Sequence, residues 1–273
     1  MKPKFEQQRC LNIAHRGASR FCPENTAVAC RAAAEAGAHM WEFDLRLSSD
    51  GELVVIHDSS TLRTSDFRSV FPVDMSPEVD RMTLDQLQLL DFGAFARSSV
   101  AGKKDCRAER SPERILTAKE ALDLSRKTGL LANAEIKDCG PESAPKIVSA
   151  LLGAIRSTGM YDRVLVSSFE FSVLRILRRM DPGLRIGVLF DTGDEIDPRV
   201  WSGIYPASCH IPLELVGPEL VRFLHRLGPS VYAYTADKTG DMRRCLEAGV
   251  DGIFTNCPER LGSLLAGMHP ELI

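Results

Sequence analysis

Hydrophobic and polar positions along the 273-residue chain form short apolar runs, separated by stretches with the spacing of amphipathic helices. Apolar runs bounded by turn residues predict buried strands, whereas apolar positions three and four residues apart predict helices. On this basis we expect strands at residues 11–14, 39–47, 130–137, 163–169, 184–190, 209–212, 230–236 and 251–255. We expect helices at residues 26–36, 83–90, 143–157, 170–180, 218–227 and 241–248.

The second predicted strand leads into a segment that breaks this alternation. A Ser-Asp-Gly turn at 49–51 is followed by the apolar run 52–57, which predicts a hairpin. The next segment, Ser59–Arg114, is mostly polar and contains three prolines. We interpret it as an insertion that lacks a core of its own, within a single domain spanning residues 1–273. In a barrel, such insertions shape access to the site.

Strands that alternate with helices of about ten residues are typical of an α/β protein with a parallel sheet. Eight such strands in a chain of this length favour a (β/α)8 TIM barrel, with the polar insertion after its second strand. The competing fold is a doubly wound open sheet. No G-x-G-x-x-G motif follows the first strand, so the commonest ligand signature of that fold is missing.

Composition narrows the classes of partner and compartment. The formal net charge is -3 and basic residues are scattered, so we expect no nucleic-acid partner. No stretch approaches the roughly 20 apolar residues of a transmembrane segment, and the first ten residues lack the apolar region of a secretory signal. The eight cysteines have no pairing pattern, which favours free thiols and a cytoplasmic location. A homo-oligomer is compatible with this composition.

Acidic residues recur at two-residue spacing on two predicted strands. Glu42 and Asp44 share one face of the second strand, because alternate side chains of a strand point the same way. Glu135 and Lys137 share one face of a later strand. The three carboxylates could together bind one divalent cation, Mg²⁺ or Ca²⁺, with positions left open for substrate oxygens. The alternatives are carboxylates paired with basic groups at an exposed strand end, and an internal Glu135–Lys137 salt bridge.

Two histidines stand at predicted strand ends, where a barrel carries its site. His15 ends the first strand and His57 ends the hairpin strand, so the two rings could divide the roles of acid and base. Asp58 could orient His57 or cap the turn that follows. Arg16 offers a planar set of donors that suits a phosphate, and Lys137 adds a second positive charge for an anionic substrate.

The loop after His15 has its own signals. Gly17 allows the backbone to turn closely past a ligand. Asn25 is predicted to cap the helix that starts at Thr26, where it would present backbone amides to an anion.

The ordered motifs resemble the glycerophosphodiester phosphodiesterase family over nearly the whole chain. Each motif is weak alone, and the set in this order is specific. The resemblance rests on "HRG" at 15–17, "PENT" at 23–26, Glu-x-Asp at 42–44, "HD" at 57–58, "EIK" at 135–137, "SSF" at 167–169 and "GVDGIFTNCPERL" at 249–261.

The resemblance implies a TIM-barrel enzyme that hydrolyses a small glycerophosphodiester to glycerol 3-phosphate and an alcohol. It assigns His15 and His57 as the acid–base pair, and Arg16 and Lys137 as phosphate-binding residues. It assigns the metal-binding role to Glu42, Asp44 and Glu135. The attacking oxygen could be water or the substrate's own neighbouring hydroxyl. The alternative activity within this fold is a lysophospholipase D, or a phosphodiester lyase that forms a cyclic phosphate.

Two strand ends depart from the usual family pattern. Where the family usually has Trp-Thr-x-Asn, this chain has Tyr234, Thr235, Ala236 and Asp237. Where the family usually has Thr-Asp-x-Pro, this chain has Thr255, Asn256, Cys257 and Pro258. Both places are predicted strand ends that could line the pocket, so the departures bear on substrate preference rather than on reaction type.

Overall fold

A computed structural model describes residues 10–94 and 112–267, with the side chains of Asp194 and Glu195 left out. The middle of the predicted insertion, residues 95–111, therefore lies outside the described residues, as does Cys106. The seven cysteines within the described residues are all free thiols, as the sequence predicts.

The strands form one closed barrel with an added hairpin strand. They are β1 (Leu11–His15), β2 (Met40–Leu47), β3 (Leu53–Val55), β4 (Leu131–Ile136), β5 (Val164–Ser168), β6 (Ile186–Leu189), β7 (Ser208–Pro212), β8 (Ser230–Tyr234) and β9 (Gly252–Thr255). Their order is β1-β9-β8-β7-β6-β5-β4-β2-β3, and pairing of β1 with β2 closes the ring. All neighbours pair in parallel except β3, which runs antiparallel to β2. The predicted (β/α)8 barrel and its hairpin are confirmed.

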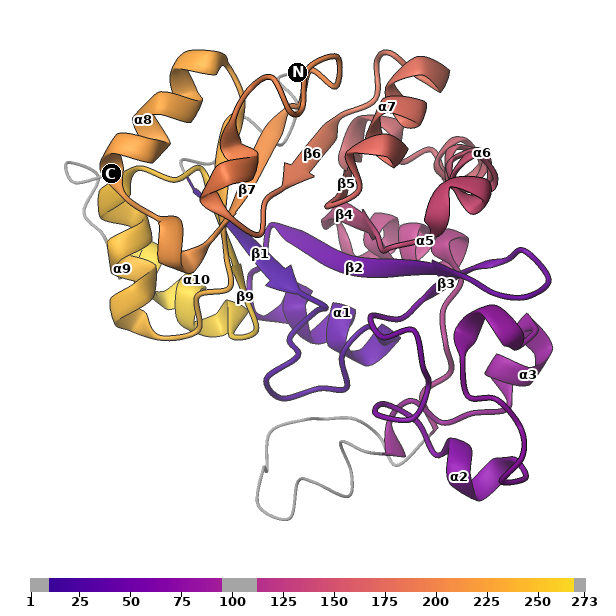
Figure 1. Ribbon diagram of the computed structural model, residues 1–273. Helices are drawn as coiled ribbons and strands as arrows, with labels where there is room; N and C mark the ends of the chain where they lie inside the picture. Colours follow the sequence, from indigo (N-terminus) through magenta and orange to yellow (C-terminus); the bar gives the residue numbers. More distant parts are fainter. Residues whose placement is uncertain (1–9, 95–111, 268–273) are drawn as a thin grey trace.

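Helices surround the barrel, and two short helices lie to one side of it in the inserted segment, as Figure 1 shows. They are α1 (Ala27–Glu35), α2 (Phe67–Val70), α3 (Leu84–Gln88), α5 (Ala118–Thr128), α6 (Gly140–Thr158), α7 (Phe171–Met180), α8 (Pro218–Leu227), α9 (Thr239–Ala248) and α10 (Pro258–Gly267). Helices α2, α5 and α10 are not among the sequence predictions. None of these described helices has the length and apolar character required to cross a membrane.

Alternating side chains give each barrel strand two buried faces. Trp41, Phe43 and Leu45 of β2 point outward into the core that the strands share with the helices. The opposite face of the barrel strands fills the interior with a separate apolar cluster, which includes Ile13 and Met40. Because strand side chains alternate, Glu42 and Asp44 are directed to the inner face.

The inserted segment has a core of its own, so the expectation that it lacks one is wrong. Phe67, Leu87 and Leu90 pack with other buried residues of the segment against Val54 and Ile56 in and after β3. Figure 1 shows α2 and α3 beside the outer end of the β2–β3 hairpin. Most of the buried residues of this cluster belong to the segment itself, and Val54 of β3 with Ile56 adds apolar surface from the hairpin.

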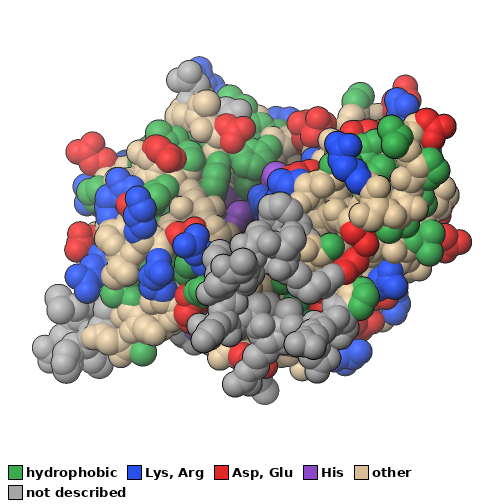
Figure 2. Space-filling model, turned by 90° about the horizontal axis from the view of Figure 1, so that it is seen from below, with side chains coloured by type: hydrophobic (Ala, Val, Ile, Leu, Met, Phe, Trp, Pro, Cys, Tyr) green, Lys and Arg blue, Asp and Glu red, His purple; other side chains and the backbone are tan. Residues whose placement is uncertain are grey.

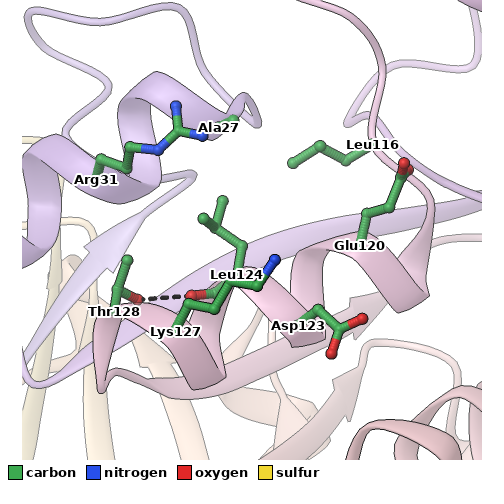
Figure 3. A pocket seen from close by; sticks show the side chains of 8 residues that line it. All are labelled: Ala27, Arg31, Leu116, Glu120, Asp123, Leu124, Lys127 and Thr128. Carbon is green, nitrogen blue, oxygen red and sulfur yellow. Dashed lines mark hydrogen bonds between the residues drawn. The ribbon is translucent and has the colours of Figure 1, made fainter.

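A shallow hollow of about 370 Å³ lies between α1 and α5. Figure 3 shows its apolar floor at Leu116 and Leu124, with charged side chains such as Arg31 and Lys127 around it. None of the predicted site residues lines this hollow.

Candidate active site

The barrel register brings three carboxylates together. Asp44 of β2 is directly opposite Glu135 of β4, and Glu42 is two residues earlier on the same face of β2. One carboxylate oxygen from each of the three residues lies within 4.8 Å of the other two. All three side chains are buried. The two-residue spacing seen in the sequence therefore corresponds to one acidic cluster inside the carboxyl end of the barrel.

Two cations contact this cluster. Lys137 Nζ lies 3.0 Å from Asp44 Oδ1 and also contacts Glu135 Oε1. Arg16 Nε lies 3.2 Å from Asp44 Oδ2, and the Arg16 backbone N–H donates to Glu42 Oε2 at 2.8 Å. The Glu135–Lys137 salt bridge considered as an alternative is thus present, as part of a larger cluster of five charged groups.

The cluster holds more negative charge than its cations balance. Burial, with repulsion from Asp44 and Glu135, raises the pKa of Glu42 well above its usual value. Burial and the charge of Asp44 raise the pKa of Glu135 to about 7. Burial opposes ionisation of Asp44 as well, but Lys137 and Arg16 outweigh it and hold the Asp44 pKa below its usual value. Repulsion of this kind is relieved when a cation binds between the carboxylates.

Two buried oxygens of the cluster, Glu42 Oε1 and Asp44 Oδ1, have no hydrogen-bond partner among the described residues, and of these Asp44 Oδ1 has an ion pair with Lys137. A buried carboxylate oxygen without a partner is costly, and carboxylate oxygens are the ligands that Mg²⁺ and Ca²⁺ take. The three residues therefore fit a divalent cation, and the acidic cluster expected from the sequence is present.

The ring of His57 is held from outside the cluster. Its Nδ1 lies 2.7 Å from Asp58 Oδ1, so Asp58 orients the ring, which decides between the two roles considered from the sequence. Asp58 is in turn bound by Arg63, whose Nε lies 2.5 Å from Asp58 Oδ2. Arg63 also makes two hydrogen bonds to Glu24, at 2.7 and 2.8 Å, and Glu24 accepts from Arg16 Nη1 at 3.1 Å. A chain of charges thus links the two histidine loops.

The ring of His15 is held by a neutral partner. Its Nδ1 lies 2.8 Å from Asn256 Oδ1, just beyond β9. Burial and the neighbouring Arg16 lower the pKa of His15 to about 4, and burial also lowers the pKa of His57. Both rings are therefore neutral near pH 7 before substrate or cation binds.

The turn after His15 differs in part from its prediction. The cap of α1 is Thr26, whose side chain accepts from the Ala29 N–H. Asn25 instead donates through Nδ2 to Asp44 Oδ2 at 2.7 Å, so the prediction that Asn25 caps the helix is wrong. Its short amide reaches across the loop because the backbone at Asn25 takes a positive φ of 61°.

These groups line a pocket of about 210 Å³ at the carboxyl ends of the strands. Its polar side is made by His15, Arg16, Glu42, His57, Glu135 and Lys137. Its opposite side is made by the largely apolar residues Phe169, Leu189, Tyr234 and Phe254, together with Thr235. Figure 2 shows a hollow on one face in which histidine and basic side chains lie together. Tyr234 packs edge-on against Phe169, so an aromatic wall is present although the usual tryptophan is replaced.

A larger and more polar cleft, of about 670 Å³, adjoins the pocket at Lys137. It runs between the start of α6, the end of β2 and the inserted segment. Charged residues of both signs line it, namely Arg46, Glu78, Asp80, Lys137, Asp138 and Lys146.

The structure brings together all seven residues predicted for the site, six of them in the pocket lining and Asp44 in the acidic cluster. Sequence reasoning missed Glu24 and Arg63 in the charge chain, and Phe169, Leu189 and Phe254 in the wall. Glu24 lies within the "PENT" motif and Phe169 within "SSF", so those motifs could have indicated both. Arg63 lies in the polar insertion and carried no such signal.

Comparison with known proteins decides the family. A model of the glycerophosphoryl diester phosphodiesterase family matches residues 15–260, from His15 into α10. The chain belongs to this family. The enzyme class expected from the sequence, a phosphodiesterase acting on glycerophosphodiesters, is thereby confirmed.

Relatives of the family cover nearly the full chain. A glycerophosphodiester phosphodiesterase of Caldanaerobacter subterraneus subsp. tengcongensis is 35% identical over 257 residues, which cover 94% of this chain and 98% of the relative. A Silicibacter pomeroyi protein assigned to the same family has a TM-score of 0.82 at 26% identity, covering 93% of this chain and 92% of its own.

A more distant neighbour shares the fold. A phosphodiesterase of Oleispira antarctica, solved in complex with the product sn-glycerol-3-phosphate, has a TM-score of 0.81 at 24% identity. The likeness covers 93% of this chain and 96% of that one.

Proposed function

We propose that this family member hydrolyses small glycerophosphodiesters to glycerol 3-phosphate and an alcohol, using a divalent cation and the pair His15 and His57. The observation that carries the proposal is the acidic cluster next to the two rings in one pocket. A protein that only bound phosphate esters would need neither two rings in the pocket nor a set of carboxylates that repel an anion.

The cation site is assigned to Glu42, Asp44 and Glu135. The pKa values of Glu42 and Glu135 are raised, which supports a hard cation with oxygen ligands at this site. The buried Oε1 of Glu42, which has no hydrogen-bond partner among the described residues, supports the same assignment. When bound there, Mg²⁺ or Ca²⁺ supplies positive charge to the phosphoryl oxygens. Arg16 and Lys137 line the same pocket and are assigned to the remaining phosphate charge.

The two histidines carry the proton transfers. One ring takes the proton of the attacking oxygen, and the other gives a proton to the leaving alcohol as the phosphorus–oxygen bond breaks. Their separate supports, Asp58 for His57 and Asn256 for His15, hold each ring from outside the pocket. Such orientation is required because a proton is transferred only over hydrogen-bond distance.

The pocket and the adjoining cleft differ in polarity, so we assign the glycerol half of the substrate to the pocket and the alcohol half to the cleft. The pocket's wall of Phe169, Tyr234 and Phe254 suits the carbon face of glycerol. The adjoining cleft bears charges of both signs, so it suits a polar or zwitterionic alcohol better than an acyl chain. This polarity favours a small glycerophosphodiester over the lysophospholipid of the alternative activity.

The proposal is tested by following phosphorus NMR of glycerophosphoethanolamine, with lysophosphatidylethanolamine in parallel. We expect conversion to glycerol 3-phosphate that stops on exhaustive chelation and returns with Mg²⁺ or Ca²⁺. His15→Ala and His57→Ala should each lose at least about 100-fold in kcat, the contribution typical of a positioned acid or base. His225→Ala is the matched control, because His225 bonds Asp251 before β9, at the amino end of the barrel.

Three results would contradict the proposal. Full activity after chelation would refute the cation site. A near wild-type rate of either histidine variant would refute the acid–base pair. A cyclic phosphate that persists, or turnover of the lysolipid alone, would support the lyase or the lysophospholipase D instead.

A further inference from the structure

Asn256, the hydrogen-bond partner of His15, is itself held by further hydrogen bonds. Ala14 of β1 pairs with Thr255 of β9, and this register places Asn256, the next residue, beside His15. Asn256 Oδ1 lies 2.8 Å from His15 Nδ1, and Ser19 Oγ donates to the same oxygen at 2.7 Å. The ring of His15 is therefore tied to the strand next to its own.

Asp237, which follows β8, fixes the orientation of the Asn256 amide. Asn256 Nδ2 donates to Asp237 Oδ2 at 2.7 Å, and the Asn256 backbone N–H donates to Asp237 Oδ1 at 2.8 Å. An ionised carboxylate only accepts hydrogen bonds, so the amide nitrogen must face Asp237. The amide oxygen must then face His15, and the usual ambiguity between the two ends of an amide is removed.

This orientation determines where the His15 proton lies. An amide oxygen has no hydrogen to donate, so the hydrogen bond to Asn256 requires a proton on His15 Nδ1. In the neutral ring, Nε2 is then an acceptor with a free electron pair. His15 lines the pocket, so this electron pair belongs to the ring atom available to a substrate.

We propose that Asn256 and Asp237 are positioning residues that hold His15 in its Nδ1–H tautomer, so that Nε2 enters the reaction as the proton acceptor. The inference rests on the proposed function, in which His15 is one of the acid–base pair. The attacking oxygen gives its proton to Nε2 as its bond to phosphorus forms. His57, which takes up a proton once the anionic substrate is bound, gives that proton to the leaving oxygen as the phosphorus–oxygen bond breaks.

The partner of His57 fits the opposite role. Asp58 is a carboxylate, and it accepts from Nδ1 while balancing the positive charge of a doubly protonated ring. Asn256 offers His15 no such charge, so it directs the ring without the stabilisation that a carboxylate gives to a positive charge. The two rings differ in chemistry because their partners differ.

Asp237 and Asn256, which contact each other, are also the two positions at which the chain departs from the usual family pattern. With Asn at 237 and Asp at 256, the hydrogen bonds between the two positions could be kept, with the carboxylate moved next to His15. The chain therefore has the amide and the carboxylate exchanged across one contact, rather than two independent changes.

A direct test uses the wild-type protein labelled with ¹⁵N-histidine, in which long-range ¹H–¹⁵N correlations distinguish the two tautomers. The His15 signals are assigned by their loss in His15→Gln. We expect a protonated Nδ1 and an unprotonated Nε2 at pH 7.5 with Mg²⁺ present. A proton on Nε2 with none on Nδ1 would overturn the proposal, whatever the variants described next show.

A kinetic test uses Asp237→Asn, Asn256→Asp and the double exchange. In D237N one of the two donors of Asn256, its backbone N–H or its Nδ2, would face an amide NH2 group, so the Asn256 amide is no longer fixed and His15 can take the wrong tautomer. In N256D two carboxylates would repel. Each single variant should lower kcat at least about tenfold with KM within about twofold, since an incorrect tautomer impairs proton transfer rather than binding. The double exchange restores complementary partners and should recover most of the loss.

Asp251→Asn is the matched control, because Asp251 also binds a histidine and a backbone N–H, at the amino end of β9. Urea unfolding of all variants separates loss of fold from loss of turnover. Losses that multiply in the double exchange, or single variants at the wild-type rate beside an inactive His15→Ala, would overturn the positioning role alone. An active His15→Ala would instead overturn the proposed function.

Discussion

The acidic cluster predicts an unusual dependence of stability on pH for the protein freed of divalent cations. Burial and the charge of Asp44 raise the pKa of Glu135 in the folded protein from 4.5 to about 7. The folded chain therefore binds a proton at Glu135 more tightly than the unfolded chain does. This contribution to stability is full below about pH 4.5 and is lost as the pH rises through about 7.

The size of the effect follows from the same pKa. A tenfold change in proton affinity is worth about 1.4 kcal/mol, so a rise from 4.5 to about 7 corresponds to about 3 kcal/mol. Glu135→Gln keeps the shape of the side chain and removes the charge. Lys137 keeps Asp44 as a partner at 3.0 Å. We expect cation-free E135Q to be more stable than wild type by about 1–3 kcal/mol at pH 8, and nearly equal to it at pH 5.

The assay is urea unfolding followed by circular dichroism at pH 5, 6, 7 and 8 in the presence of a chelator. Adding Mg²⁺ or Ca²⁺ at pH 8 should stabilise wild type much more than E135Q, because the variant lacks one of the three carboxylates. Glu247→Gln, on the exposed side of α9, is the control and should follow wild type at each pH. The reasoning is refuted if the stability difference between E135Q and wild type does not grow between pH 5 and 8, or if E135Q is the less stable protein at pH 8.

Two further predictions concern the loops of the site. Gly17→Ala should destabilise the fold by at least about 2 kcal/mol in urea unfolding, because φ is +86° at Gly17 and a Cβ there would lie 2.6 Å from the Ala29 backbone. The control is Gly153→Ala in α6, where a Cβ would meet no atom within 4 Å, and this variant should be neutral or stabilising. Arg63→Lys should lower kcat several-fold in a steady-state assay without a change in the free energy of unfolding, because a lysine cannot contact both Glu24 and Asp58 with a planar group. The control is Arg68→Lys on the exposed face of α2, which should have no effect on kcat.

Most of the barrel could be predicted because its strands carry strong local signals. Buried parallel strands are continuous apolar runs, and eight of them with helices between leave few arrangements. Helix α5 was missed although its signals are present. Thr117 and Glu120 form a capping box and Gly129 ends the helix in a left-handed conformation. These signals follow directly on the polar insertion, whose composition obscured the start of the helix.

The composition of the inserted segment did not indicate its apolar cluster. Its polar residues predicted no core, yet Phe67, Leu87 and Leu90 find apolar partners in Val54 and Ile56. Most of the buried cluster residues are scattered along the segment itself, and the hairpin completes the cluster with these two side chains. A cluster of this kind can be read only after the path of the chain is known.

The inner part of the site was predictable for the same reason as the strands. Strand periodicity places Glu42 and Asp44 on one face of β2, and the carboxyl ends of parallel barrel strands meet at one edge, so Glu135 was expected close to them; the structure adds the direct register of Asp44 with Glu135. The outer part was not predictable, because Arg63 reaches Glu24 across 39 residues and Asn256 reaches His15 across 241. Loop contacts over such separations leave no periodic trace in a single sequence.

The cluster inside the barrel contains more acidic than basic side chains. The barrel strands supply three carboxylates, and Lys137 and Arg16 bring only two positive charges to them. In the proposed function, a divalent cation would displace the protons that Glu42 and Glu135 hold near neutral pH and would add its own positive charge beside the phosphodiester. Binding of cation and binding of substrate must then strengthen each other by the same factor, because coupling between two sites is reciprocal. The loop-borne supports of the histidines lie outside this balance, so the barrel sets affinity for the anion while the loops set the direction of proton transfer.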